Sequence, residues 1–453
     1  MRIVICGAGQ VGTTIARHLA TRGDNVTVID ENADRARRIG ESYDVRAILG
    51  HASHPEVLRR AGAQDADMLI AVTRSDDVNM VACQVAYSLF SVKRRVARLR
   101  HAGFLERDGS GLFAAEHMPI DVLISPEIEI AESIARRLRT PGAFEVAPFA
   151  EGKVALLGIH VEDSRAPLAG ERLSEVQSRP EAVAMIPVAV RRKGRIFEPG
   201  ADYRFEVGDD LYVLAEAERL AEVQQAFGHR ERRARQIVIA GAGNIGVHLV
   251  HRVRSTLPGC DIKLIEIDRA RAEKVAGELG DIALVLNGDA LEQELLEEGQ
   301  LGLADTMVTV TNDDETNIFS AVLAKQAGCK RAIALIEKGS YQRLIPTLGI
   351  DSVLDPSSAT IATVLRHMRG GAIVGAHDIG EGFGEVVEVG VSAGSTIEGR
   401  SGDDLHGEGV RLLALIRGRK MFAELAGQSL RAGDRVLFLV AKGHWPAAEK
   451  LFG

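Results

Sequence analysis

The chain contains two copies of one unit, and this duplication restricts its fold more than any other feature. Residues 3–12, IVICGAGQVG, return as IVIAGAGNIG at residues 237–246. The match continues downstream, where VTVIDENADRAR at residues 26–37 pairs with IKLIEIDRARAE at residues 262–273. Because the spacing between the copies drifts by only a few residues over a long span, we infer that one folded unit was duplicated.

The later part of each copy repeats as well, more faintly. AVRRKGRIFEPGADYRFEVGDDLYVLA at residues 189–215 pairs with ALIRGRKMFAELAGQSLRAGDRVLFLVA at residues 414–441. A basic run, HRERRAR at residues 229–235, separates the copies, and we interpret it as a solvated linker rather than a binding patch. The expected parts are two Rossmann-like lobes and two smaller lobes with their connecting helices, at residues 1–124, 125–228, 234–354 and 355–453.

The first part of each copy alternates short apolar runs with amphipathic stretches. Fully apolar strands between helices indicate a parallel sheet that is covered on both faces. The predicted fold class is therefore α/β, with two tandem Rossmann-like doubly wound parallel-sheet domains, each followed by a small α+β domain. In the first copy we expect strands at Arg2–Cys6, Asn25–Ile29, Arg46–Leu49, Met68–Val72 and Arg95–Leu99, helices at Val11–Thr21 and Val78–Phe90, and a closing helix at Ala217–Phe227.

The glycine motif of the first copy carries the clearest chemistry. Gly7, Gly9 and Gly12 follow a predicted strand and open a predicted helix, which is the context that a dinucleotide fingerprint requires. These glycines permit a tight turn, a close approach of backbone N–H groups to a pyrophosphate, and close packing of helix on strand. Asp30 ends the second strand, where it can accept hydrogen bonds from ribose hydroxyls and repel a 2′-phosphate. The motif therefore favours NAD or an adenine nucleotide over NADP.

The second copy repeats the whole arrangement. Gly241, Gly243 and Gly246 stand in the same context, and Glu266 takes the place of the acid. The alternative is that the glycines serve only a tight turn. This alternative has more weight for the second copy, since duplicated sites often decay.

Other positions differ between the copies. Arg98 and Arg100 follow the fifth strand and could clamp phosphates, whereas the second copy has Leu335 and Glu337, with Lys338 as the nearest cation. After the third strand the first copy has His51 where the second has Asp289. The two sites are therefore expected to differ in ligand or affinity. The alternative for the arginines is a solvated strand end.

A polar triad recurs after the fourth strand of each copy. We expect these residues to cap the following helix, to contact the ligand, or both. They are Thr73, Asp76 and Asn79 in the first copy and Thr311, Asp314 and Asn317 in the second.

The sequence lacks the marks of a catalyst. His51 has no evident acid or nucleophile partner, and there is no Walker A lysine motif, no HExxH metal motif and no paired His and acid for hydride transfer. We therefore expect no catalytic residue, no metal site and no enzyme activity. The alternatives are an NAD-dependent oxidoreductase and a scaffold with relict sites.

Composition narrows the class of protein further. The chain has 453 residues, 26% of them charged, and a net charge of −8, which disfavours a nucleic-acid partner. The four cysteines are scattered without CxxC spacing, a pattern that fits a reducing cytosol. No signal peptide and no apolar stretch of about 18 residues is present, so work at a membrane would need a partner.

The predicted connecting helices carry apolar stripes. Such a stripe packs either on its own domain or on a neighbouring copy. On the second reading we expect a symmetric homo-oligomer, a tetramer with eight Rossmann lobes. The stripe residues are Ile128, Ile130, Ile134 and Leu138 in the first copy and Ile361, Val364 and Leu365 in the second.

The first copy resembles an RCK (KTN) unit with its RCK-C lobe. The resemblance rests on the order of its motifs, which are GAGQVG, VID, GHAS, TRSDDVN and VARLR, followed by the later lobe with its Gly-Asp step. Two such units in one chain resemble the peripheral nucleotide-binding subunit of bacterial Trk potassium uptake systems. The resemblance implies binding of NAD(H) or ATP/ADP, and a cytoplasmic ring that docks on the inner face of the membrane and gates a transmembrane potassium-transporting subunit. By position it implies ligand contacts at Gly7, Gly9, Gln10, Val11, Gly12, Asp30, Thr73, Arg100, Gly241, Gly243, Asn244, Ile245, Gly246 and Glu266. The chain departs from the usual pattern at His51, where the family commonly has Asp. The remaining candidate nucleotide-binding residues are His51, Arg98, Asp289 and Thr311.

Overall fold

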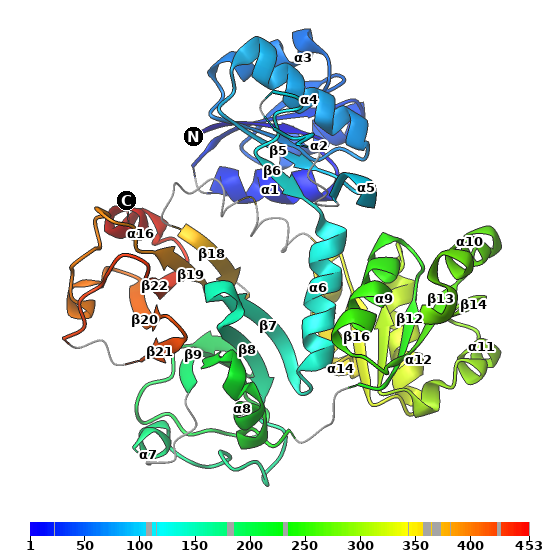
Figure 1. The fold of residues 1–453 in the computed structure, drawn as a ribbon, viewed down its shortest axis with the longest axis vertical. Coiled ribbons are helices and arrows are strands. Elements are labelled where there is room, and N and C mark those ends of the chain that lie inside the picture. The colour runs from blue at the N-terminus through cyan, green and yellow to red at the C-terminus, as the bar shows by residue number, and fades with distance from the viewer. Residues whose placement is uncertain are drawn as a thin grey trace. The chain divides into compact units, whose positions relative to one another are not determined.

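The protein is described here by a computed structural model. The described residues are all of 1–453 except 22, 106–110, 115, 179–184, 230–233, 343, 357–363, 365–372, 381, 424–426 and 453. The chain forms two compact units (Figure 1). The first holds residues 1–130 and the short described part of 355–367, and the second holds residues 131–354 together with the described residues after 372.

The first Rossmann lobe is a six-stranded parallel sheet in the order β3-β2-β1-β4-β5-β6. Its strands β1, β2 and β4 are short and almost wholly buried, as expected for a sheet with helices on both faces, whereas the edge strands β3 and β6 are only partly buried. The order reverses between β1 and β4, which creates the crevice where doubly wound folds bind ligands. The elements are β1 (Arg2–Cys6), α1 (Gln10–Thr21), β2 (Asn25–Asp30), α2 (Ala33–Ser42), β3 (Arg46–Leu49), α3 (Pro55–Arg60), β4 (Met68–Ala71), α4 (Asp76–Phe90), β5 (Arg94–Arg98), α5 (Ala102–Leu105) and β6 (Val122–Ile124).

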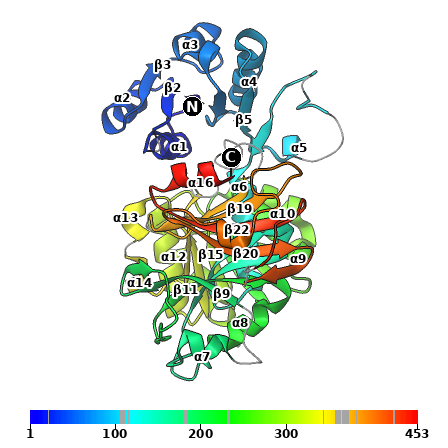
Figure 2. The ribbon, with the colours of Figure 1, turned by 90° about the vertical axis from the view of Figure 1, so that its left-hand side faces the viewer.

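The second Rossmann lobe has the same topology, β14-β13-β12-β15-β16-β17, again all parallel. Its helices α9, α10 and α12 and its strand β15 are labelled in Figure 2. The predicted fold class is thus confirmed in both copies. The elements are β12 (Gln236–Ala240), α9 (Asn244–Thr256), β13 (Asp261–Glu266), α10 (Arg269–Leu279), β14 (Leu284–Asn287), α11 (Gln293–Glu298), β15 (Thr306–Thr309), α12 (Asp314–Gln326), β16 (Arg331–Leu335), α13 (Gly339–Gln342), α14 (Ile345–Leu348) and β17 (Ser352–Leu354).

The predicted boundaries hold to within one or two residues. The fourth helix begins at Asp76 rather than Val78, because the Ser75 side chain accepts a hydrogen bond from the Val78 N–H and caps the first turn. The closing helix predicted at Ala217–Phe227 is a 3₁₀ turn at Ala217–Arg219 followed by α8 (Leu220–Ala226).

Each smaller lobe is a five-stranded antiparallel sheet with helices. The first has the order β10-β9-β11-β8-β7 and the second β18-β19-β22-β20-β21. A single buried cluster contains Phe149, Tyr212 and Leu214 of the first lobe and Val386 and Leu437 of the second, so the two lobes share a core. Their elements are β7 (Ala143–Phe149), β8 (Val154–His160), α7 (Leu173–Gln177), β9 (Met185–Arg192), β10 (Arg195–Phe197), β11 (Asp210–Glu216), β18 (Ile373–Asp378), β19 (Gly384–Gly390), β20 (Val410–Arg417), β21 (Lys420–Phe422), β22 (Arg435–Ala441) and α16 (Trp445–Phe452).

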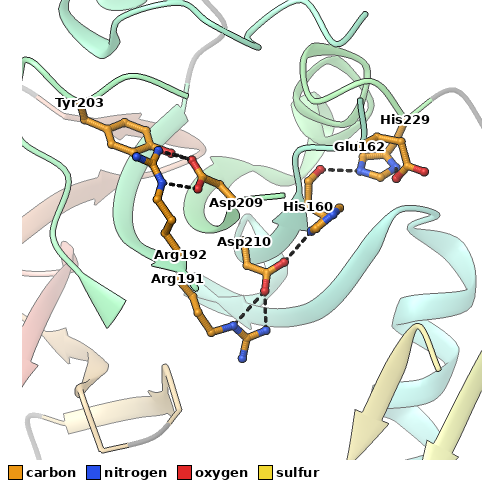
Figure 3. A network of polar contacts seen from close by, with 8 residues as sticks. All are labelled: His160, Glu162, Arg191, Arg192, Tyr203, Asp209, Asp210 and His229. Carbon is orange, nitrogen blue, oxygen red and sulfur yellow. Dashed lines mark hydrogen bonds and ion pairs between the residues drawn. The ribbon is translucent and has the colours of Figure 1, made fainter. Parts of the chain in front are cut away.

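A network of hydrogen bonds and ion pairs holds the turn before β11 in the first smaller lobe (Figure 3). The buried Asp209 accepts hydrogen bonds from Tyr203 Oη at 2.5 Å and from Arg192 Nε at 2.6 Å. Asp434 accepts from Arg417 Nε at 2.9 Å at the same place in the second copy. Because both copies keep this aspartate–arginine pair, we interpret it as a structural feature of the lobe.

The connecting helix α6 (Pro126–Arg139) joins the first Rossmann lobe to the smaller lobe. Its side chains at Ile130, Ile134 and Leu138 are 0–2% exposed, and Ile128 is half-buried. The stripe is therefore buried within one chain, and it does not need a second copy to cover it. The expectation of an oligomer assumed that a second copy covers this stripe, and for α6 that assumption is wrong.

Two further expectations meet the limits of the described residues. In the second connecting helix Val364 is buried, whereas Ile361 and Leu365 lie outside the described residues. The basic run at 229–235 is described only at its ends. There His229 is 4% exposed, with Nε2 2.8 Å from the carbonyl oxygen of His160, so this end of the run is packed rather than solvated.

Candidate functional site

The glycine turn of the first Rossmann lobe connects β1 to α1. Gly7 has a φ of +110°, a conformation that favours glycine. A Cβ on Gly12 would overlap the carbonyl oxygen of Gly7, so the third glycine is required by the turn itself. A Cβ on Gly9 would meet nothing within 4 Å. Gly9 therefore leaves open space above the start of α1, where exposed Gln10 begins the helix and Val11 packs beneath it.

Asp30 binds this turn directly. Its Oδ2 accepts a hydrogen bond from the Ala8 N–H at 2.6 Å, and its Oδ1 accepts one from the Asn32 N–H at 2.8 Å. The carboxylate is 7% exposed and keeps further lone pairs, because each oxygen can accept more than one hydrogen bond. Asp30 thus holds the glycine turn against the end of β2, and its contact with a ribose stays a prediction. Sequence reasoning had predicted only the second role.

The second copy reproduces this geometry. Gly241 has a φ of +107°, a Cβ on Gly246 would overlap the carbonyl oxygen of Gly241, and Gly243 again has open space around it. The N–H of Ala242 donates to Glu266 Oε2 at 3.0 Å, and the Asp268 N–H donates to Oε1 at the same distance. Glu266 is 8% exposed. Exposed Asn244 and half-buried Ile245 begin α9 as Gln10 and Val11 begin α1.

The polar triad after the fourth strand has a structural role. Asn79 is fully buried; its Oδ1 lies 2.7 Å from Thr73 Oγ1, and its Nδ2 donates to the Arg98 carbonyl at 2.9 Å. Asp76 accepts the N–H groups of Arg100 and His101. The triad therefore ties the loop after β4 to the end of β5, and Ser75 is the helix cap instead.

The second triad makes the same contacts. Thr311 Oγ1 lies 2.7 Å from Asn317 Oδ1, and Asn317 Nδ2 donates to the Leu335 carbonyl at 2.9 Å. Asp314 accepts the N–H groups of Glu337 and Lys338, while Asp313 caps α12 through the Thr316 N–H. The triads place Thr73 and Thr311 at the rim of the crevice, and whether they touch a ligand stays a prediction.

Arg98 and Arg100 converge on a residue that sequence reasoning missed. Arg98 Nη2 lies 2.8 Å from Glu127 Oε1, and Arg100 Nε lies 3.5 Å from the same oxygen. The Arg98 side chain is 13% exposed, so the alternative of a solvated strand end is wrong for it. Burial and the neighbouring charge of Arg98 lower the pKa of Arg100 below its usual value. Two cations thus share one carboxylate at the carboxyl edge of the sheet.

The signal that could have revealed Glu127 lies in the repeat. Arg98, Arg100 and Glu127 stand where the second copy has Leu335, Glu337 and Ser357, so all three charges change together. This arginine–glutamate cluster is therefore present in one copy only. It is the largest chemical difference between the two sites.

His51 and Asp289 also differ in what they offer a ligand. His51 Nδ1 lies 2.8 Å from Ser53 Oγ, and its ring lies 4.8 Å from that of His54. Asp289 Oδ1 accepts the Leu291 N–H at 2.9 Å. Both side chains sit just after the third strand, beside the acid that holds the glycine turn.

The groups that the first crevice offers are of the kind that bind nucleotides. Among the described residues, no group of three His, Cys, Asp or Glu side chains gathers to hold a metal ion. The four cysteines are buried, and burial raises the pKa of Cys6 to about 12, so that thiol is a poor nucleophile. The residues that remain, an open glycine turn, an acid and an arginine pair, fit the diphosphate and ribose of a nucleotide.

The family follows from the match to known domains. A model of the TrkA-N domain matches residues 3–125 and again residues 237–356, and a model of the TrkA-C domain matches residues 159–228. The chain belongs to the TrkA family. The TrkA-N matches coincide with the two Rossmann lobes, and the TrkA-C match falls on the first smaller lobe.

Full-length relatives in the TrkA family support this assignment. The Trk system potassium uptake protein TrkA of Azorhizobium caulinodans is 38% identical over 454 residues, which cover 100% of this chain and 98% of that protein. The protein of the same name from Vibrio alginolyticus is 38% identical over 457 residues, with the same coverage. That of Haemophilus influenzae is 35% identical over 458 residues, again with 100% and 98% covered.

Solved structures confirm the fold of this TrkA-family chain. The crystal structure of the GsuK RCK domain matches with a TM-score of 0.62 at 18% identity, covering 99% of this chain and 94% of that one. The GsuK channel bound to NAD matches with a TM-score of 0.61 at 18% identity, covering 99% and 78%. No helix in the described part of this chain is long and apolar enough to cross a membrane.

Proposed function

We propose that this chain is the regulatory subunit of a potassium uptake system, and that it controls ion flux through a transmembrane partner by binding NAD(H) or ATP/ADP. The observation that carries the proposal is the pair of glycine turns, each held by a buried acid and each open at its second glycine. The relatives support the proposal, because they carry the name Trk system potassium uptake protein TrkA. Two solved structures of GsuK, one bound to NAD and one bound to ADP, show that this neighbour in fold binds both nucleotides.

The first site is the better candidate for an anionic ligand. A pyrophosphate at the start of α1 meets the helix N-terminus, and phosphate oxygens farther along the sheet edge meet Arg98 and Arg100. Asp30 disfavours a 2′-phosphate, so NAD(H) binds in preference to NADP(H). The second site keeps Glu266 and lacks the arginines, so it binds a different ligand or binds the same one more weakly.

The proposed mechanism is a shift between conformations. Bound nucleotide favours the conformation that it binds more tightly, and it is not consumed. The subunit acts as a homo-oligomer, a tetramer, on the inner face of the membrane beside its potassium-transporting partner. In this scheme the residues of the chain bind and orient the nucleotide, and none performs a chemical step.

The deciding experiment is a nucleotide titration followed by reconstitution. Purified chain should bind NADH, ADP or ATP in calorimetry, and with its membrane partner in vesicles it should change potassium flux when one nucleotide replaces another. Steady oxidation of NADH would support an oxidoreductase instead. Absence of any nucleotide binding would indicate a scaffold with relict sites.

A further inference from the structure

The arginine–glutamate cluster at the end of β5 has more cationic than anionic charge. The charged groups that act on Arg100 are Arg98 and Arg74, which are cationic, and Glu127 and Asp76, which are anionic. Asp76 is already engaged with two backbone N–H groups. Glu127 is therefore the carboxylate that neutralises the arginine pair directly.

The hydrogen-bonding capacity of this cluster is only partly used. Within the described residues, Arg98 Nε, Arg100 Nε, Glu127 Oε2 and Ser125 Oγ are buried and have no hydrogen-bond partner. Glu127 and Ser125 are each 8% exposed. Buried polar atoms of this kind cost free energy, so the cluster has donors to spare for another anion.

The cluster lies within reach of a ligand at the glycine turn. β1, β4 and β5 are consecutive neighbours in the sheet, so the ends of β1 and β5 are two strand spacings apart, about 10 Å. A single phosphate at the glycine turn does not span that distance. A triphosphate or a second nucleotide half does.

We propose that Glu127 acts as an internal competitor, a carboxylate that occupies Arg98 and Arg100 until the terminal phosphate of a nucleotide displaces it. The inference rests on the proposed function, because it needs a nucleotide at the first glycine turn. A terminal phosphate carries more charge and more acceptor oxygens than one carboxylate, and arginine forks bind it bidentately. Glu127 thus lowers the affinity of the first site and selects for ligands that reach the arginines.

Displacement of Glu127 also acts on the connecting helix. Glu127 lies in the first turn of α6, so its bond to Arg98 fixes the start of that helix to the end of β5. The sequence of the second copy has serine at the position that matches Glu127, with leucine and glutamate in place of the two arginines, so it lacks the residues that form this arginine–glutamate pair. Occupancy of the first site alone therefore frees the start of a connecting helix.

The test compares Glu127→Gln with wild-type protein by calorimetric titration of ATP, ADP and AMP in EDTA. The first-lobe binding event is identified as the one that Gly9→Ala abolishes. We expect Glu127→Gln to bind ATP about tenfold more tightly, the order expected for removal of one charge-assisted competing bond, and to bind AMP unchanged. Glu129→Gln, which removes a charge from the same helical turn, should leave ATP affinity unchanged.

Two further measurements separate the outcomes. In a background that carries both Arg98→Leu and Arg100→Leu, Glu127→Gln should no longer affect ATP binding, because neither arginine remains for Glu127 to occupy. Amide hydrogen exchange in residues 127–131 should rise when ATP is added to wild-type protein. Unchanged or weaker ATP binding by Glu127→Gln would overturn the inference and leave the proposed function standing, whereas absence of nucleotide binding in all variants would overturn the proposed function.

Discussion

At the scale of single residues, the glycines of each turn divide according to what a side chain would meet. Gly12 and Gly246 face a carbonyl oxygen of their own turn, whereas Gly9 and Gly243 face open space. The same residue type thus serves folding at one position and ligand access at another. This division makes the two kinds of position separable by mutation.

Alanine substitutions should therefore have opposite effects within one motif. Gly12→Ala should destabilise the first lobe by more than about 4 kcal/mol, because the methyl group overlaps backbone. Gly9→Ala should leave the melting temperature nearly unchanged and abolish the nucleotide-binding event of the first lobe, since its methyl group would occupy the space proposed for the ligand. Calorimetric unfolding and nucleotide titration measure the two effects. A stable Gly12→Ala variant, or normal binding by Gly9→Ala, would contradict this division.

Asp30 has two roles, and its removal should affect both. Asp30→Ala leaves the N–H groups of Ala8 and Asn32 without their acceptor, and loss of the acceptor of the buried Ala8 N–H should cost about 1–3 kcal/mol. The same change should weaken NADH binding about tenfold, and wild-type protein should prefer NADH to NADPH. Thermal unfolding together with NADH and NADPH titrations checks these expectations. Equal binding of the two cofactors, unaffected by Asp30→Ala, would disprove the ribose role.

A histidine in the first smaller lobe makes its stability depend on pH. His160 Nδ1 lies 2.7 Å from Asp210 Oδ1, and this hydrogen bond raises the pKa of His160 above 6.5 (Figure 3). Burial alone would raise the pKa of Asp210, but the contacts with His160 and Arg191 hold it below its usual value.

Because the folded pKa of His160 is raised, its contribution is fully present below pH 6.5 and is lost as the pH rises through the folded value. We expect the melting temperature to fall over this range in wild-type protein and to fall less in His160→Gln, which cannot titrate. Parallel pH profiles for the two proteins would contradict the assignment. Asp210 keeps its bonds to Arg191 throughout, so only part of the network responds.

At the scale of elements, the end of α6 is anchored to the second Rossmann lobe. Arg331 on β16 donates through Nη1 to the Arg137 carbonyl at 2.8 Å, and through Nη2 to the Ala143 carbonyl. Ser352 Oγ donates to the Phe144 carbonyl at 2.9 Å. The carbonyls at and just beyond the last turn of a helix need partners, and here another lobe supplies them.

Arg331→Met should therefore loosen the end of α6 from the second lobe. Charged hydrogen bonds of this type contribute about 1.5–3 kcal/mol each, so denaturant unfolding should report a loss of that order. Amide exchange at residues 137–144 should increase. Arg331→Lys should recover only part of the loss, because lysine lacks the fork that reaches two carbonyls. Full recovery would mean that charge alone holds the contact.

At the scale of the whole molecule, duplication gives one chain two proposed nucleotide sites, and their residues differ chemically. Both keep the open glycine and the buried acid, and only the first keeps the arginine–glutamate cluster. A protein with two such sites can respond to two ligands, or to one ligand in two concentration ranges.

The two sites should be separable in calorimetry. Arg100→Ala should impair only the binding event of the more anionic ligand, and Glu266→Ala should leave that event largely intact. Loss of the same event in both variants would show that the sites are not independent. Light scattering of the same samples tests the tetramer, and a monomer at micromolar concentration would contradict it.

The sequence by itself determined the repeat, the parallel sheets and the glycine turns. These features are local or periodic: apolar runs form buried strands, and the spacing of Gly7, Gly9 and Gly12 specifies a turn whatever surrounds it. The strand boundaries could be predicted for the same reason, because each apolar run begins and ends within the local sequence. The roles of Gly9 and Asp30 toward a ligand, which the fingerprint predicts, stay predictions.

Only the tertiary structure decided which distant side chains meet. The pairing of Arg98 with Glu127 depends on where β5 and α6 end, and the bond from Ala8 to Asp30 depends on β1 and β2 being neighbours. The burial of the α6 stripe within the chain, one of the two alternatives that the sequence left open, has the same origin. Such contacts join residues far apart in the chain, and no local pattern records them, because the fold alone sets the distance between two charges.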